Sequence, residues 1–147
     1  MCNIKKYILI VIFIVLVFSI YSYAGIIITN LDNSSYYPII TLDSNNKIHI
    51  SYIKNNPAPL RLKYVTNTSG DWEYITLDNG SNRYSSIVID SNNKVHISFY
   101  NDTSIILKYA TNVSGSWVFM TLDSIGNIVG EYSSIAIDSN NKVHISY

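Results

Sequence analysis

The sequence predicts an all-β protein built from repeats, and three observations lead to this prediction. Three nine-residue segments nearly coincide: SNNKIHISY at Ser44 to Tyr52, SNNKVHISF at Ser91 to Phe99 and SNNKVHISY at Ser139 to Tyr147. They recur at steps of 47 and 48 residues, a period that is typical of stacked supersecondary units. The residues between them are rich in Ile, Val, Tyr and Thr, and they lack helical periodicity.

Each complete unit is predicted to contain four short strands. The first two are joined through Asp90-Ser91-Asn92-Asn93, where paired asparagines tolerate the positive φ of a tight hairpin. The last two are joined by a polar turn that contains Gly115. In the second unit the strands are expected at Ser85 to Ile89, Lys94 to Phe99, Ile105 to Ala110 and Trp117 to Leu122.

The segment before the first unit is predicted to be a fourth strand without its first three partners. Asn30-Leu31-Asp32 aligns with Thr76-Leu77-Asp78 at the end of the first unit. The predicted organisation is therefore a fourth strand in 25–36, complete units in 37–83 and 84–131, and two strands of a third unit in 132–147. Together these make eleven expected strands.

The N-terminus has the pattern of a secretory signal peptide. Lys5 and Lys6 precede an uncharged apolar run, and Ser22 and Ala24 occupy the −3 and −1 positions of a cut before Gly25. Residues 1–24 are expected to be removed, which predicts a secreted or cell-surface protein. The alternative is a retained membrane anchor, because the apolar run approaches the length that crosses a bilayer.

Charge and cysteine content restrict the partners. Removal of Lys5 and Lys6 leaves 8 basic against 10 acidic residues, a formal charge of −2, and no basic cluster that would bind nucleic acid. Cys2, the single cysteine, lies in the signal segment. Disulfides therefore cannot stabilise the exported part, which depends on packing between its repeats.

These repeats give the chain a resemblance to β-propellers, in particular to secreted bacterial arrays related to sialidase-type and lectin-type propellers. A blade of a propeller is a four-stranded antiparallel sheet, and several blades pack around an axis. The resemblance implies that residues 25–147 form about two and a half blades of an incomplete ring. Either further blades belong to a longer polypeptide, or identical chains complete the ring together.

Two turns are similar to the Asp-box of sialidase-like propellers. TNTSGDW at Thr66 to Trp72 and TNVSGSW at Thr111 to Trp117 occupy the corresponding turn between third and fourth strands. The family aspartate is displaced, and the glycine precedes the tryptophan by two residues in place of three. An Asp-box is an element of the fold and does not imply catalysis.

The histidines and aspartates of the repeat are predicted to be structural. One histidine of each unit is expected to bond to a neighbouring strand, since the three lie too far apart to share one metal ion. One aspartate precedes Ser-Asn-Asn-Lys in each unit and is expected to stabilise that turn, because a calcium loop would place an oxygen ligand at the lysine position. These residues are His49, His96, His144, Asp43, Asp90 and Asp138.

No catalytic, metal or cofactor site is predicted. Ser, His and Asp recur in every unit, whereas an active site is a single constellation on a scaffold. Sialidases hold the substrate carboxylate with three arginines, and this chain has only Arg61 and Arg83. The sequence therefore leaves catalysis undecided and favours a protein that is not an enzyme.

The aromatic side chains near the Asp-box-like turns are the candidate ligand-binding residues. Sugars stack their apolar faces on aromatic rings while amides bind their hydroxyls. The competing interpretation is that these rings fill the space between units. The candidates are Trp72, Tyr74 and Asn67 in the first unit and Trp117, Phe119 and Asn112 in the second.

Three functions are compatible with this pattern. The first is a secreted or surface binding and scaffolding module with glycans or surface polymers as ligands. The second is a fragment of a glycan hydrolase whose catalytic residues lie outside this chain, and the third is a purely structural surface array. An open array of such units would expose strand edges and would tend to self-associate.

Overall fold

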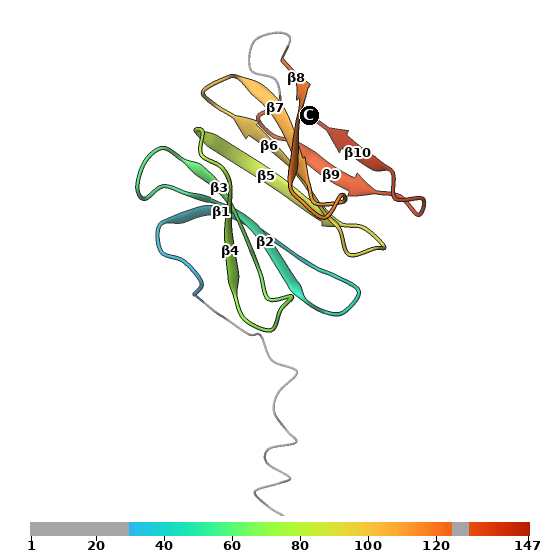
Figure 1. Ribbon diagram of the computed structural model, residues 1–147. Coiled ribbons are helices and arrows are strands. Elements are labelled where there is room, and N and C mark those ends of the chain that lie inside the picture. The colour runs from blue at the N-terminus through green and yellow to red at the C-terminus, as the bar shows by residue number, and fades with distance from the viewer. Residues whose placement is uncertain (1–29, 125–129) are drawn as a thin grey trace, which may run out of the picture. The chain divides into compact units, whose positions relative to one another are not determined.

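The computed structural model describes residues 30–124 and 130–147, which form ten β-strands and no helix (Figure 1). The strands belong to three antiparallel sheets in which sequence neighbours pair. The all-β class and the four-stranded antiparallel sheets predicted from the sequence are confirmed. The first sheet contains β1 (Ser35–Leu42), β2 (Ile48–Lys54), β3 (Arg61–Thr66) and β4 (Glu73–Asp78). The second contains β5 (Asn82–Ile89), β6 (Val95–Asn101), β7 (Ile106–Thr111) and β8 (Val118–Asp123), and the third β9 (Ser134–Ile137) and β10 (Val143–Ser146).

Some predictions fall outside these residues. The signal segment 1–24 and most of the proposed first strand at 25–31 are not among the described residues. Asn30 and Leu31, which are described, belong to no strand. The eleventh strand and the boundaries of the predicted units thus stay predictions.

A β-bulge in the first strand of both complete sheets is the main departure from the predicted strands. β5 begins at Asn82, three residues before the predicted start, and its register shifts between Arg83 and Ser86. β1 shifts in the same way between Tyr36 and Ile39. A bulge adds one unpaired residue to a strand, so strand alternation alone could not predict it.

The main core lies between the first two sheets. Side chains of a strand alternate between its two faces, so Ser51 and Ile53 of β2 share the face turned toward the second sheet. This face is called the trailing face of a sheet, and the face turned toward the preceding unit is called the leading face. The core is formed by Ile53, Leu62, Tyr64 and Leu77 with Ile87, Val95, Ile97, Phe99 and Ala110, and Trp117 packs against it.

The first strands of the three units lie next to one another. β5 contacts β1 on one side and β9 on the other (Figure 1). The second sheet therefore packs with its leading face on the first sheet and with its trailing face on the β9–β10 pair. Ile135 of β9 is buried where Ile87 of β5 is buried one unit earlier.

The Asp-Ser-Asn-Asn-Lys turns have one geometry in all three units. In the second turn, Asp90 Oδ1 accepts hydrogen bonds from the N–H groups of Asn92 (2.9 Å) and Lys94 (2.7 Å). Asn93 has φ of 59°, a left-handed conformation that asparagine tolerates. Asp43 and Asp138 accept the equivalent pairs of bonds, so the aspartate holds the turn in each unit.

Gly130 provides a test of packing in the second unit. Its φ is +81°, and a Cβ at this position would lie 2.6 Å from Cβ of the fully buried Leu107. Gly115 also has a positive φ, of +89°, but a Cβ there would meet no atom. Both Gly→Ala changes place a Cβ on a backbone of positive φ, which is unfavourable. Only Gly130→Ala also makes that Cβ overlap with Leu107.

We therefore expect Gly130→Ala to lower the free energy of unfolding by about 1–3 kcal/mol more than Gly115→Ala does, because overpacking adds to the strain. Urea denaturation of the two variants measures the difference. Equal losses would show that Gly130 does not pack on Leu107 as described.

Candidate functional site

The repeated histidine is buried between an aspartate and a tyrosine in the first unit. His49 Nδ1 lies 2.6 Å from the hydroxyl oxygen of Tyr64, which is on the neighbouring strand β3. His49 Nε2 lies 3.5 Å from Asp43 Oδ2, a close electrostatic contact without hydrogen-bond geometry. The tautomer with hydrogen on Nε2 suits both neighbours, because Tyr64 then donates to Nδ1 and the N–H faces the carboxylate.

The second unit repeats this cluster almost atom for atom. His96 Nδ1 lies 2.5 Å from the hydroxyl oxygen of Tyr109, and His96 Nε2 lies 3.5 Å from Asp90 Oδ2. In the third unit His144 Nε2 lies 3.2 Å from Asp138 Oδ2. The side chains of His49 and His96 are 2% and 4% exposed, whereas that of His144 is 63% exposed.

Burial determines the protonation of these histidines. It lowers the pKa of His49 and of His96, and the adjacent aspartates oppose this only in part. Burial acts to raise the pKa of Asp43, but hydrogen bonds from Lys47 N–H and Asn45 N–H and the contact with His49 lower it overall. At neutral pH the cluster of the first unit therefore consists of a neutral His49 imidazole and an Asp43 carboxylate.

The tyrosine of the cluster is not a ready proton donor for chemistry. Burial raises the pKa of Tyr64 to about 12, so its hydroxyl stays protonated and donates to His49. Ser51, which lies two residues after His49 on β2, instead accepts a hydrogen bond from Ser85. The described residues thus contain a stabilising Asp–His–Tyr cluster in place of a Ser–His–Asp arrangement.

Serine pairs join each sheet to the next. Ser85 Oγ of the second sheet donates to Ser51 Oγ of the first at 2.9 Å, and Ser133 Oγ donates to Ser98 Oγ at the same distance one unit later. Ser51 and Ser98 are fully buried. These hydroxyls are used in contacts between sheets, which a repeated serine in the sequence could not reveal.

The candidate asparagines have structural partners. Asn67 Oδ1 accepts the N–H of Ile48 at 2.7 Å, and Asn112 Oδ1 accepts the N–H of Val95 at 2.8 Å. Their backbone carbonyls also accept the N–H groups of Gly70 and Gly115 in the turns between β3 and β4 and between β7 and β8. Each asparagine therefore fixes its turn to strand β2 or β6, so its amide oxygen is already engaged.

The candidate aromatic residues divide into packed and exposed members. Trp117 is half-buried and contacts Tyr64 of the first sheet edge-on, with 5.2 Å between ring centroids. Tyr74 on β4 and Phe119 on β8 are exposed, and Trp72 is half-buried. Trp117 thus fills space between the first two sheets, which is the role that the competing interpretation gave to these rings.

A row of tyrosines at the bulged strands is a candidate site that the sequence interpretation missed. The ring centroids of Tyr37 and Tyr84 are 4.6 Å apart, those of Tyr84 and Tyr132 are 4.5 Å apart, and Tyr36 lies 6.3 Å from Tyr37. We call Tyr36, Tyr37, Tyr84 and Tyr132 the tyrosine row. Tyr37, Tyr84 and Tyr132 recur at the first position of each predicted unit, and Tyr37 and Tyr84 lie in the bulges of β1 and β5.

Charged groups accompany the tyrosine row. Arg83 pairs with Asp102, with 3.2 Å between Nη2 and Oδ2, and both side chains are partly exposed. Hydrogen bonding to Tyr84 raises the pKa of Tyr37, and the positive charge of Arg83 acts in the opposite direction. The row therefore combines three exposed rings, those of Tyr36, Tyr37 and Tyr132, with a half-buried Tyr84, hydroxyl groups and an adjacent ion pair with no net charge.

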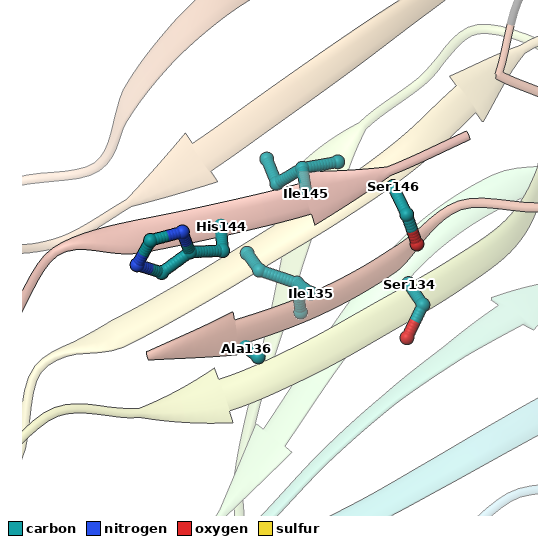
Figure 2. Close-up of a pocket in the computed structure, with 6 residues that line it drawn as sticks. All are labelled: Ser134, Ile135, Ala136, His144, Ile145 and Ser146. Atoms are coloured by element: carbon teal, nitrogen blue, oxygen red, sulfur yellow. The ribbon is translucent and has the colours of Figure 1, made fainter. Parts of the chain in front are cut away.

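The β9–β10 pair carries a hollow of about 230 Å³ lined by Ser134, Ile135, Ala136, His144, Ile145 and Ser146. Figure 2 shows the hydroxyls of Ser134 and Ser146 directed to the same side of the pair, away from Ile135 and Ile145. The hollow therefore lies against a sheet face.

The described residues contain no group of three or more His, Cys, Asp or Glu side chains that could hold a metal ion. In residues 30–124 and 130–147 no helix is long and apolar enough to cross a membrane.

No protein-family model matches the chain, and no curated protein is significantly similar to it.

The buried histidines predict a pH-dependent stability. Their pKa values are lowered in the folded state, so the unfolded chain binds more protons once the pH falls below the ordinary histidine value of 6.5. The stabilisation is complete above that pH and is lost as the pH falls toward the folded pKa, with a slope of at most about 1.4 kcal/mol per pH unit for each histidine.

Denaturation at several pH values between neutrality and mild acid measures this slope. We expect the double variant His49→Gln/His96→Gln to be less stable and to have a flatter slope than the unmodified chain. His144→Gln, a change at the exposed histidine, should keep the original slope. A slope that the double variant leaves unaltered would contradict the assignment.

Proposed function

We propose that the protein is a secreted or cell-surface binding and scaffolding module that forms part of a β-propeller and binds glycans. The antiparallel sheets stacked face to face support a propeller-like array, and the N-terminal pattern supports export. The exposed tyrosine row is the observation that carries the binding function. It extends over all three units, as an extended ligand requires.

The backbone at the row is strained. Tyr37 and Tyr84 have φ of 53° and 46°, a region that bulky side chains rarely adopt. Such conformations cost about 1–3 kcal/mol each and occur preferentially at functional sites. Of the two strained residues, Tyr37 is 48% exposed and Tyr84 is half-buried between Tyr37 and Tyr132.

The chemistry of the row suits carbohydrates. Exposed ring faces offer stacking surfaces for the apolar face of a sugar, and the tyrosine hydroxyls and the Arg83–Asp102 pair offer hydrogen bonds to its polar edge. Because that ion pair is internally neutral, we propose uncharged glycans or surface polymers as ligands. Tyr74 and Phe119, exposed on β4 and β8, are a second set of candidate contacts.

Binding of the purified protein to a glycan array, followed by titration of the best ligand, tests this function. We expect Tyr132→Ala to weaken binding by about tenfold, since truncating a stacking anchor costs more than 1 kcal/mol. Tyr147→Ala is the matched control, because Tyr147 is 63% exposed but lies outside the row. Absence of any glycan ligand, or equal affinities for the two variants, would refute the proposal.

A further inference from the structure

The leading face of the first sheet exposes a position that the later units bury. Ile40, Ile87 and Ile135 are equivalent residues of β1, β5 and β9, and they are 63%, 7% and 8% exposed. Ile87 and Ile135 are buried because a preceding sheet packs on them. Leu42, on the same face as Ile40, is also exposed. The leading face of the first sheet is thus an exposed apolar surface. The equivalent faces of the later units are covered by the sheet that precedes them.

The third unit has the complementary exposure. His144 is exposed where His49 and His96 are buried, and the hollow on the β9–β10 pair includes His144, Ser134 and Ser146 (Figure 2). In the first two units the equivalent trailing face is covered by the leading face of the following unit. Within residues 30–124 and 130–147, both halves of the interface that joins the units are therefore exposed.

We propose that a second copy of this chain docks head to tail, with the leading face of its first sheet on the trailing face of the β9–β10 pair. The two contacts between units within the chain supply the template. This inference concerns the stacking of units alone and does not depend on the glycan-binding function.

Polar contacts in the turns specify the register of this docking. Asn93 Oδ1 accepts the N–H of Ser44 at 3.0 Å, and Asn141 Oδ1 accepts the N–H of Ser91 at 3.1 Å. Asn46 has φ of 58°, against 59° and 60° for Asn93 and Asn141, so it presents the same turn. Asn46 of one copy would thus accept the N–H of Ser139 of the other.

The tyrosine row continues through the same junction. Tyr84 stacks on Tyr37 and Tyr132 stacks on Tyr84, so Tyr37 of the second copy would stack on Tyr132 of the first. One contact is lost, because Pro38 stands where Ser85 and Ser133 donate their hydroxyls. The interface between copies is therefore a weaker version of the interface between units.

Such a contact uses two different surfaces and gives rings or open arrays according to its rotation. Sedimentation velocity of the protein recovered from an exporting host, over a wide range of concentration, tests the proposal. We expect the sedimentation coefficient to rise with concentration. Ile40→Glu should weaken self-association by about tenfold or more, because it places an unpaired carboxylate in the contact.

Val113→Glu is the matched control, since Val113 is 51% exposed in the turn between β7 and β8 and should leave association unaltered. Far-ultraviolet circular dichroism verifies that both variants fold, and Leu42→Lys replaces Ile40→Glu if that variant does not. A wild-type protein that stays monomeric at all concentrations would overturn the proposal, whether or not it binds a glycan.

Cysteine cross-linking tests the register, because residues 30–147 contain no cysteine. Single variants Asn46→Cys and Ser139→Cys, mixed under oxidising conditions, should form a disulfide-linked pair. A mixture of Asn46→Cys and Val113→Cys should form far less of it. Equal yields from the two mixtures would exclude the proposed geometry.

Discussion

Packing of the trailing face of one sheet on the leading face of the next is the interaction on which the rest of this structure depends. A sheet of four short strands cannot bury its own faces, so a unit of this length obtains a core only from its neighbour. Ile53, Leu62 and Tyr64 meet Ile87, Ile97 and Phe99 in the main core. The serine pairs and the tyrosine row repeat with the period of that contact.

The Asp–His–Tyr clusters fix the side chains on the trailing faces of the first two sheets. A hydrogen bond between His49 and Tyr64 connects β2 to β3 within the sheet, while Asp43 holds the preceding turn. Tyr64 then presents its ring to Trp117 of the next sheet. The repeated Asp, His and Tyr residues and Trp117 therefore belong to one structural system.

The sequence predicts the parts of the fold that depend on local pattern. The hairpin at Asp90 and the strands around it follow from residues close together in the chain, and the structure contains them. Tyr64 as the partner of His49 could not be predicted, because it depends on pairing of β2 with β3. The positions of Tyr37 and Tyr84 in the tyrosine row depend on bulges that break strand alternation, and the packing of Trp117 depends on contact between sheets.

A double-mutant cycle between Tyr64 and Trp117 tests the central contact most directly, because these rings come from different sheets. Free energies of unfolding would be measured for Tyr64→Leu, Trp117→Leu and the double variant. Edge-on packing of the two rings predicts a coupling energy of about 0.5–1.5 kcal/mol. Effects that add with no coupling would contradict face-to-face stacking of the units.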